Sequence, residues 1–324
     1  MNVRPRVNRA TPARRDLIFG TTLSQSLVQP YFVTPGEGVT EPVPNMPGIY
    51  RQSVDSLLAS IQEDFENGIR NIMLFPVVPS KQKDMHATVC MDENMHLYQA
   101  VRELKKTFGE TIVVMTDLCL CASTEHGHCG LVEGSEIVND SSAKRIAEIA
   151  LLHAKAGTDY IACSDMMDGR VNLIRQALEK SNQHTTGIMS YAVKYASSFY
   201  GPFRGAADSS PASGDRRTYQ MDVRSGYKEA LLEASLDEDE GADIIMVKPG
   251  LPYLDVLSKV SAHVNRPTAV YNVSGEYSMV MNSPGDGESK GMMVTEILNS
   301  FQRAGADVIV TYHARDALKS GWVV

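Results

Sequence analysis

A short segment that recurs along the 324-residue chain constrains its fold more than any other feature. In each copy a Gly precedes an apolar run, and the seventh residue after that Gly carries a reactive or hydrogen-bonding side chain. The copies are Gly157–Ser164, Gly241–Lys248 and Gly305–Tyr312, and 68–75 keeps the same register. A Gly after a helical pattern indicates the end of a helix, and a short apolar run indicates a buried strand. The repeat therefore predicts helix–strand units whose strands end on these side chains.

Strand-like apolar runs recur through the rest of the chain, with a helical stretch after nearly every one. We predict eight strands, over 28–33, 70–76, 112–117, 159–164, 186–192, 243–248, 268–273 and 306–312. Helical periodicity is clear in 54–65 and 294–301, where apolar residues recur at i, i+3, i+4 and i+7. Eight β/α units predict a (β/α)8 TIM barrel. We expect a single catalytic domain over 26–324 and an extended N-terminal arm over 1–25.

A TIM barrel builds its active site at the carboxyl ends of its strands. The side chains that close the repeat, Ser164, Lys248 and Tyr312, are therefore expected at one end of the barrel. We expect the Gly/Ser/Pro-rich stretch 201–214 and the stretch 281–291 to form loops over this end.

The charge and hydrophobicity of the chain indicate what kind of partner it binds. The formal net charge is −8, no long Lys/Arg tract is present, and the apolar runs are short. A membrane-spanning helix needs about 20 apolar residues. We therefore expect neither nucleic acid nor membrane as the main partner, and we expect a small molecule instead. Five Cys without a disulfide-like spacing indicate a reducing compartment, so we expect a cytoplasmic protein.

The segment after the third predicted strand is rich in metal-binding side chains. It contains three thiols, Cys119, Cys121 and Cys129, and two imidazoles, His126 and His128. Zn²⁺ binds Cys or His in a tetrahedron, and three protein ligands leave one position open for water or substrate. The three Cys therefore predict a catalytic zinc, the alternative being a chance cluster of buried thiols. The two His stay open between ligands, proton carriers and loop structure.

Two lysines, Lys194 and Lys248, stand at the ends of predicted strands. Lys is rarely fully buried, so each needs an explanation. One explanation is that the amine reaches solvent along an apolar stem. The other is Schiff-base chemistry, in which a neutral amine attacks a carbonyl. Lowering a Lys pKa from ~10.4 to ~7 costs about 4–5 kcal/mol, supplied by burial or by a second cation. Two lysines in one barrel mouth favour this second explanation.

Further polar residues lie where they could hold carboxylates. Arg204 and Arg216 belong to a basic loop, and an Arg fork binds a carboxylate through two hydrogen bonds. Ser274 and Tyr312 could donate hydroxyls to a second carboxylate. The alternatives are solvated loop charges for the arginines and ordinary strand-end hydrogen bonds for the hydroxyls.

Several segments, in the right order and nearly end to end, closely resemble the porphobilinogen synthase family, also called 5-aminolevulinate dehydratase. One is the metal loop with its three Cys. The others are residues 4–6, 9–12, 164–170, 194–204, 246–255 and 273–276. The resemblance implies a hydro-lyase that condenses two molecules of 5-aminolevulinate to porphobilinogen, with loss of two waters, in tetrapyrrole and haem biosynthesis.

The resemblance also implies roles for individual residues. Lys248 would form the Schiff base with the propionate-side substrate, and Lys194 is implicated with the acetate-side one. Asp117 and Ser164 would support proton transfers near the lysines. The implied substrate-binding residues are Arg204, Arg216 and Gln220 on the acetate side, Ser274 and Tyr312 on the propionate side, and Tyr200 and Phe203.

Metal use and assembly follow from the same resemblance. Three Cys match the zinc-using members, in which the zinc acts as a Lewis acid, whereas other members carry Asp and Ala-type residues there and depend on Mg²⁺. The loop departs from zinc-type relatives after Cys121, where Ala-Ser-Thr replaces the common Pro-Tyr-Thr. Glu229 is the implied ligand of a second, allosteric Mg²⁺, with Glu233 as a competing choice. The resemblance further implies a homo-octamer held through the Arg-rich N-terminal arms.

Two other functions are weighed against this one. A class I aldolase on the same barrel also uses a strand-end lysine, but it would need neither three thiols nor a second lysine. A non-enzymatic barrel that stores zinc or acts as a scaffold would be favoured by loss of either lysine, and both are present.

Overall fold

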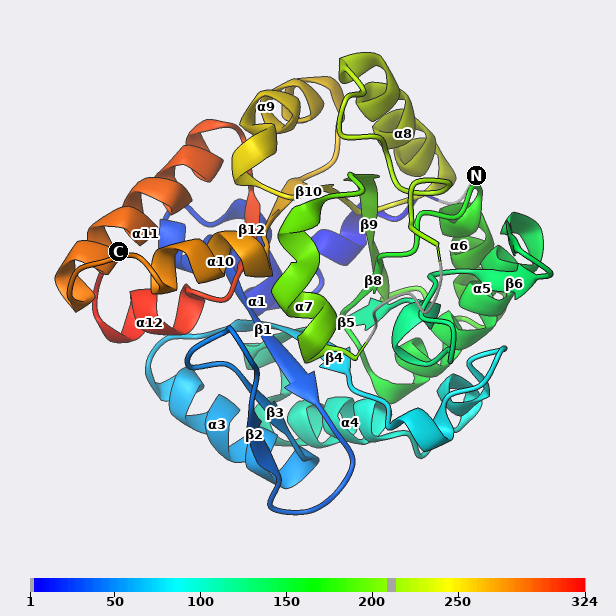
Figure 1. The fold of residues 1–324 in the computed structure, drawn as a ribbon, viewed down its shortest axis with the longest axis horizontal. Coiled ribbons are helices and arrows are strands. Elements are labelled where there is room, and N and C mark those ends of the chain that lie inside the picture. The colour runs from blue at the N-terminus through cyan, green and yellow to red at the C-terminus, as the bar shows by residue number, and fades with distance from the viewer. Residues whose placement is uncertain (1–2, 209–213, 324) are drawn as a thin grey trace.

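The computed structural model describes residues 3–208 and 214–323. In this part of the chain eight parallel strands close into a barrel, with the last strand paired to the first (Figure 1). They are β1 (Leu27–Val33), β4 (Asn71–Pro76), β5 (Val113–Leu118), β8 (Tyr160–Cys163), β9 (Gly187–Lys194), β10 (Ile244–Lys248), β11 (Thr268–Asn272) and β12 (Val308–Thr311). The predicted (β/α)8 TIM barrel is confirmed, and each predicted strand overlaps an observed one.

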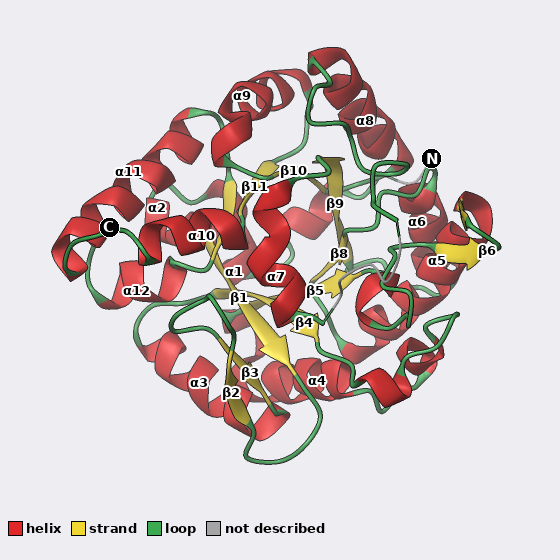
Figure 2. Ribbon diagram, viewed as in Figure 1, coloured by secondary structure: helices red, strands yellow, loops and turns green. Residues whose placement is uncertain are grey.

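A helix follows each barrel strand and packs outside the sheet (Figure 2). These helices are α3 (Val54–Glu66), α4 (His96–Phe108), α5 (Asn139–Ala156), α6 (Arg170–Lys180), α8 (Tyr227–Glu240), α9 (Leu254–His263), α11 (Gly287–Arg303) and α12 (Ala314–Lys319). None of the described helices combines the length and the apolar character needed to cross a bilayer.

Shorter elements decorate the two ends of the barrel. The α-helices and strands are α1 (Pro12–Phe19), α2 (Leu23–Ser26), β2 (Thr40–Pro42), β3 (Tyr50–Gln52), β6 (Leu131–Glu133), β7 (Glu136–Val138), α7 (Gly201–Ala206) and α10 (Ser274–Met281). The 3₁₀ helices are η1 (Pro5–Arg9), η2 (Ser80–Gln82), η3 (Thr88–Met91), η4 (Gly109–Thr111), η5 (Leu120–Ala122), η6 (Ser198–Tyr200) and η7 (Leu251–Tyr253).

The repeat in the sequence has a structural cause. Gly157, Gly241 and Gly305 have φ values of 101°, 107° and 101°, a conformation that glycine adopts without strain where a helix ends. The Asp two residues later accepts a hydrogen bond from a backbone N–H of the neighbouring strand. The pairs are Asp159 with Val114, Asp243 with Ile188 and Asp307 with Thr268, each at 2.8–2.9 Å. Each copy of the repeat thus ends one helix and fixes the position of the strand that follows relative to the neighbouring strand.

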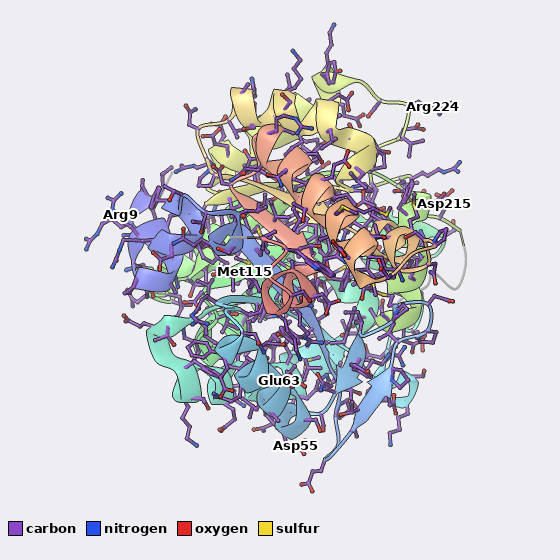
Figure 3. All side chains as sticks on the ribbon, turned by 90° about the vertical axis from the view of Figure 1, so that its left-hand side faces the viewer. Arg9, Asp55, Glu63, Met115, Asp215 and Arg224 are labelled. Atoms are coloured by element: carbon purple, nitrogen blue, oxygen red, sulfur yellow. The ribbon has the colours of Figure 1, made fainter. Side chains whose placement is uncertain are left out.

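The first residues of the chain close the amino-terminal end of the barrel. Arg14 of α1 forms a buried ion pair with Asp159 at 2.7 Å, and the Asn8 side-chain amide donates to the carbonyl of Asp243 at 3.0 Å. Asp159 and Asp243 immediately precede β8 and β10. In Figure 3, Arg9 and Asp215 lie on opposite sides of the molecule, with Met115 of β5 between them. A role of residues 1–25 as an arm for subunit contacts stays a prediction.

Two predicted loops are partly helical. Gly201–Ala206 forms α7, which crosses the front of the barrel in Figure 1, because Pro202 fits a first helical turn and Phe203 packs on Phe32 and Phe75. Residues 209–213 of the same stretch lie outside the described residues. In the second loop α11 begins at Gly287, because the Asp286 carboxylate accepts a hydrogen bond from the Ser289 amide at 3.0 Å.

Candidate active site

Alternation along the strands carries four of the predicted site residues into the barrel. Side chains on a strand alternate between its two faces. On β10, Ile244 and Met246 belong to the apolar cluster inside the barrel, whereas Ile245 and Val247 pack against the helices. Lys248 therefore faces inward. The same alternation along β5, β8 and β12 places three more side chains on the inner face, those of Asp117, Ser164 and Tyr312.

Lys194 reaches the same space through an irregularity in β9. Ser190 pairs with Ile245 and Val193 pairs with Val247, so β9 contains one residue more than β10 over this stretch. An inserted residue of this kind, a β-bulge, reverses the face on which the following side chains lie. The Lys194 Nζ lies 5.6 Å from the ring centre of Tyr191, a residue of the apolar cluster inside the barrel. The same Nζ donates a hydrogen bond to the carbonyl oxygen of Ser164. Both predicted lysines thus meet at the carboxyl end of the barrel.

Burial and a neighbouring charge change the chemistry of Lys248. Its side chain is 6% exposed. Burial first, and the charge of Lys194 second, lower the pKa of Lys248 to about 7, against the attraction of Asp117 and Cys121. At this pKa about half of the amine is neutral at pH 7, and the neutral form is the one that attacks a carbonyl. Lys248 therefore has the reactivity that Schiff-base chemistry requires.

A backbone network fixes the ends of the two lysine-bearing strands. The Tyr195 amide donates to the Lys248 carbonyl at 3.0 Å. The Tyr200 hydroxyl contacts the carbonyl oxygens of Tyr195 and Lys248 at 2.8 and 3.2 Å. Tyr200, predicted to bind substrate, thus uses its hydroxyl in this structure to tie the two strand ends together.

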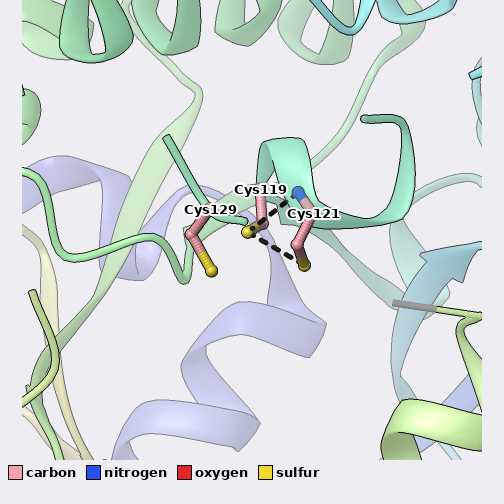
Figure 4. A group of neighbouring side chains, drawn as sticks. All are labelled: Cys119, Cys121 and Cys129. Carbon is pink, nitrogen blue, oxygen red and sulfur yellow. Dashed lines mark hydrogen bonds between the residues drawn. The ribbon is translucent and has the colours of Figure 1, made fainter. Parts of the chain in front are cut away.

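The three predicted metal ligands come together beside the lysines. The Sγ atoms of Cys119, Cys121 and Cys129 all lie within 4.8 Å of one another, and all three residues are buried (Figure 4). For Zn–S bonds of about 2.3 Å, the sulfurs of a tetrahedral site lie about 3.8 Å apart, so the group fits such an ion. The cluster can therefore hold a metal ion.

The other cysteines and histidines stay outside this group. The Cys90 thiol donates to the Ser123 hydroxyl at 3.0 Å, and Cys163, the last residue of β8, is buried in the cluster between the strands and the helices. His126 Nδ1 accepts from the His128 amide at 3.1 Å, and His128 Nδ1 lies 3.2 Å from the Tyr219 hydroxyl. Among the described residues, the three Cys are the one set of His, Cys, Asp or Glu found close enough to share an ion.

The predicted carboxylate-binding residues divide into two groups. Arg216 is buried next to the thiols, and its Nη2 donates to the carbonyl of Gly127 in the metal loop at 2.9 Å. Arg204 lies on α7, where burial and the charge of Arg216 lower its pKa. Gln220 is 3% exposed, and neither its side-chain oxygen nor its nitrogen has a hydrogen-bond partner among the described residues. These three polar groups are suited to an anionic ligand.

The second group comes from the start of α10, the end of β12 and α7. The Ser274 hydroxyl accepts from the Phe203 amide at 2.9 Å, so here it holds α7 to α10. The Tyr312 hydroxyl accepts from the Tyr271 hydroxyl at 3.1 Å. The Phe203 ring centre lies 5.2 Å from Lys248 Nζ. Two hydroxyls and an aromatic ring thus surround the space next to the reactive amine.

Glu229 lies away from the barrel interior. A cavity of about 770 Å³ is lined by residues of β7, α8 and the segment 214–222, including Gln220, Glu229 and Glu233. Burial raises the pKa of Glu233 to about 7, with Asp237 adding to the effect. The magnesium predicted at Glu229 stays a prediction, and Glu233 lines the same cavity.

Sequence patterns gave no indication of several residues around the site. Tyr191 and Tyr271 line the barrel below the lysines, and their apolar strands do not distinguish them from ordinary core residues. Arg170 forms a buried pair with Asp237 at 2.7 Å and lies 3.6 Å from Asp165, which follows Ser164. A charged residue at the start of a helix carries no sequence signal of burial.

Comparison with known proteins identifies the family. The family model described as delta-aminolevulinic acid dehydratase matches residues 2–320. The chain belongs to this family. The delta-aminolevulinic acid dehydratase of Methanothermus sociabilis is 48% identical over 306 residues, 94% of each chain. That of Bacillus subtilis is 45% identical over 313 residues, 96% of this chain and 94% of the relative.

A solved structure of the delta-aminolevulinic acid dehydratase family agrees with the observed fold. The Toxoplasma gondii enzyme, also named porphobilinogen synthase and solved in complex with its reaction product porphobilinogen, superposes with a TM-score of 0.89 at 42% identity. The match covers 99% of this chain and 92% of that one. The family resemblance seen in the sequence segments is therefore confirmed, and so is the whole-chain extent of the match.

Proposed function

We propose that this protein is a porphobilinogen synthase, a hydro-lyase that condenses two molecules of 5-aminolevulinate to porphobilinogen with loss of two waters. The observation that carries the proposal is the pairing of two buried strand-end lysines, Lys194 and Lys248, beside three clustered thiols in a chain of this family. A class I aldolase is not favoured, because it requires neither the second lysine nor the thiols.

The first chemical step belongs to Lys248. Its neutral amine adds to the ketone carbon of one substrate, and the ketone oxygen leaves as water, so that a carbon–nitrogen double bond replaces the carbonyl. Lys194 lies opposite and serves the second substrate. Asp117 and Ser164 face the lysines, where protons must move during condensation, and burial raises the pKa of the Asp117 carboxyl to about 6 against the attraction of the two lysine charges.

The substrate carboxylates need cationic or hydroxyl partners on both sides. We assign the acetate-side carboxylate to Arg204, Arg216 and Gln220. Arg216 and Gln220 are buried, and Arg216 lies beside the thiols. We assign the propionate-side carboxylate to Ser274 and Tyr312. Binding there requires Ser274 to exchange its hydrogen bond with the Phe203 amide for one with the ligand.

We propose zinc as the ion of Cys119, Cys121 and Cys129, because three thiolates suit zinc better than the harder Mg²⁺. When bound there, it supplies a Lewis acid next to the acetate-side substrate. Arg216, tied to the metal loop through Gly127, orients that substrate toward Lys194.

Three further features are part of the proposal. An allosteric Mg²⁺ bound at Glu229 would draw on the carboxylates that line the adjacent cavity, Glu233 among them. A homo-octamer joined by the N-terminal segments suits the four exposed or partly exposed arginines of that segment. A cytoplasmic location suits five free, buried cysteines.

The test is product formation by the purified protein from 5-aminolevulinate. We expect porphobilinogen to form, activity to fall after treatment with a chelator, and zinc to restore it. Recovery with Mg²⁺ alone would keep the reaction but overturn the assignment of zinc to the thiols. Absence of porphobilinogen with either metal, or turnover of a sugar phosphate instead, would overturn the proposed reaction.

A further inference from the structure

The amines of the two lysines are held in different ways. Lys194 Nζ donates a hydrogen bond to the carbonyl of Ser164. Lys248 Nζ makes no hydrogen bond or ion pair with any residue that the structure describes. Aromatic rings surround it instead, with centres at 4.0 Å for Tyr271, 5.1 Å for Tyr191, 5.2 Å for Phe203 and 5.4 Å for Tyr200.

These four aromatic rings can stabilise a positive charge on Lys248 Nζ. The face of an aromatic ring is negative, and a cation within about 6 Å of the ring centre is attracted, most strongly when water is excluded. Among charged neighbours, Lys194 and Arg216 repel a positive charge on Lys248, whereas Asp117 and Cys121 attract it. Ring faces stabilise a cation without occupying a hydrogen-bond direction, so Nζ stays accessible to an incoming carbonyl.

The Tyr271 ring is fixed where it makes the shortest contact. Its hydroxyl donates to the Tyr312 hydroxyl at 3.1 Å. Its ring packs against Phe75 and Tyr191, with centres 6.3 Å away in each case. These ring contacts and the hydroxyl bond therefore hold the Tyr271 ring in its position next to Nζ.

We propose that Tyr271 is a catalytic residue whose ring face stabilises the positive charge on the Schiff-base nitrogen of Lys248. The proposal rests on the proposed function, since it takes Lys248 as the residue that forms the imine. A neutral amine, a ketone and one proton give a protonated imine and one water. The proton stays on the nitrogen, where it withdraws electrons from the adjacent carbon, and Tyr191, within 5.6 Å of both amines, extends the same stabilisation to Lys194.

The test changes the charge of the ring face while keeping the ring. Phenylalanine, 4-fluoro-, 3,5-difluoro- and pentafluorophenylalanine are placed at position 271 of the full chain. We expect kcat, and the rate at which borohydride traps the 5-aminolevulinate adduct, to fall stepwise with fluorination, about tenfold over the series. Tyr271→Phe alone removes the hydroxyl bond to Tyr312, so it should mainly raise the half-saturating substrate concentration.

A matched series separates this effect from altered packing. The same fluorinated residues placed at Phe108, whose ring packs on Phe65 at 5.1 Å far from the barrel mouth, should leave kcat unchanged. A flat response at position 271, or an equal fall at position 108, would overturn the role of Tyr271 while leaving the reaction in place. Absence of any Lys248 adduct in the unsubstituted protein would overturn the proposed function as well.

Discussion

Lys194 and Lys248 lie directly opposite each other in the parallel register of β9 and β10. Neighbouring strands run about 4.8 Å apart, so the two lysine side chains start from adjacent backbone positions and extend side by side. Burial first, and repulsion by the positive charge of Lys194 second, favour the neutral form of Lys248 and lower its pKa to about 7. The strand pairing thus helps to create the nucleophile.

This relationship predicts a pH dependence. Lys248 is neutral above its pKa of about 7, so the rate of borohydride-trapped adduct formation should rise about fivefold between pH 6 and pH 7 and less than twofold beyond. Replacing Lys194 with Met removes the repelling charge, so the rise should shift to higher pH. An unshifted profile in Lys194→Met, measured by single-turnover trapping, would contradict the account.

The same pKa predicts the sign of a stability effect. Because the folded state disfavours the charged amine, it binds fewer protons than the unfolded chain between pH 7 and the ordinary lysine range. Stability should therefore rise with pH across this window. Lys248→Met should flatten that part of the curve, as measured by the denaturation midpoint at each pH.

Removing one thiol should remove the metal and the activity together. In Cys121→Ala we expect metal content, measured by mass spectrometry, to fall to background and turnover to fall with it, because two thiolates hold an ion far less tightly than three. Cys163→Ala is the matched control, since it also removes a buried thiol. Full metal occupancy in the Cys121 variant would show that these thiols are not the ligands.

Arg216→Ala should chiefly weaken substrate binding. Hydrogen bonds to a charged group contribute about 1.5–3 kcal/mol, so the half-saturating concentration of 5-aminolevulinate should rise about 10- to 100-fold. The neighbouring Arg217 is exposed and pairs with Asp215, so Arg217→Ala is the control. Equal saturation curves for the two variants would count against Arg216 as a carboxylate ligand.

Breaking the ion pair beneath Ser164 should destabilise the protein. Arg170 is fully buried and pairs with Asp237, so Arg170→Met leaves that carboxylate buried without its partner. Loss of one member of a buried pair costs about 3–5 kcal/mol. The melting temperature should fall well below that of Arg145→Met, which breaks a surface pair with Glu148. Equal melting temperatures would refute this role.

The barrel and most inward-facing residues could be predicted because strand alternation is local. Apolar periodicity located every strand, and the residues that close the repeat, such as Lys248, follow the count along their strands. The inward orientation of Lys194 could not be predicted from alternation, because it depends on a bulge in β9 that is visible only in the pairing with β10. The helix at Gly201–Ala206 was missed because Gly and Pro usually indicate loops, whereas Phe203 is held by tertiary packing on Phe75. Nor did any local pattern show that Tyr271 lies over an amine.

The most direct test of the central claim is to reduce the protein with borohydride in the presence of 5-aminolevulinate and map the adduct by peptide mass spectrometry. We predict an adduct on Lys248, its loss in Lys248→Met, and its retention in Lys155→Met, which changes an exposed lysine. An adduct confined to other lysines, or an undiminished adduct in Lys248→Met, would contradict the assignment of Lys248 as the nucleophile.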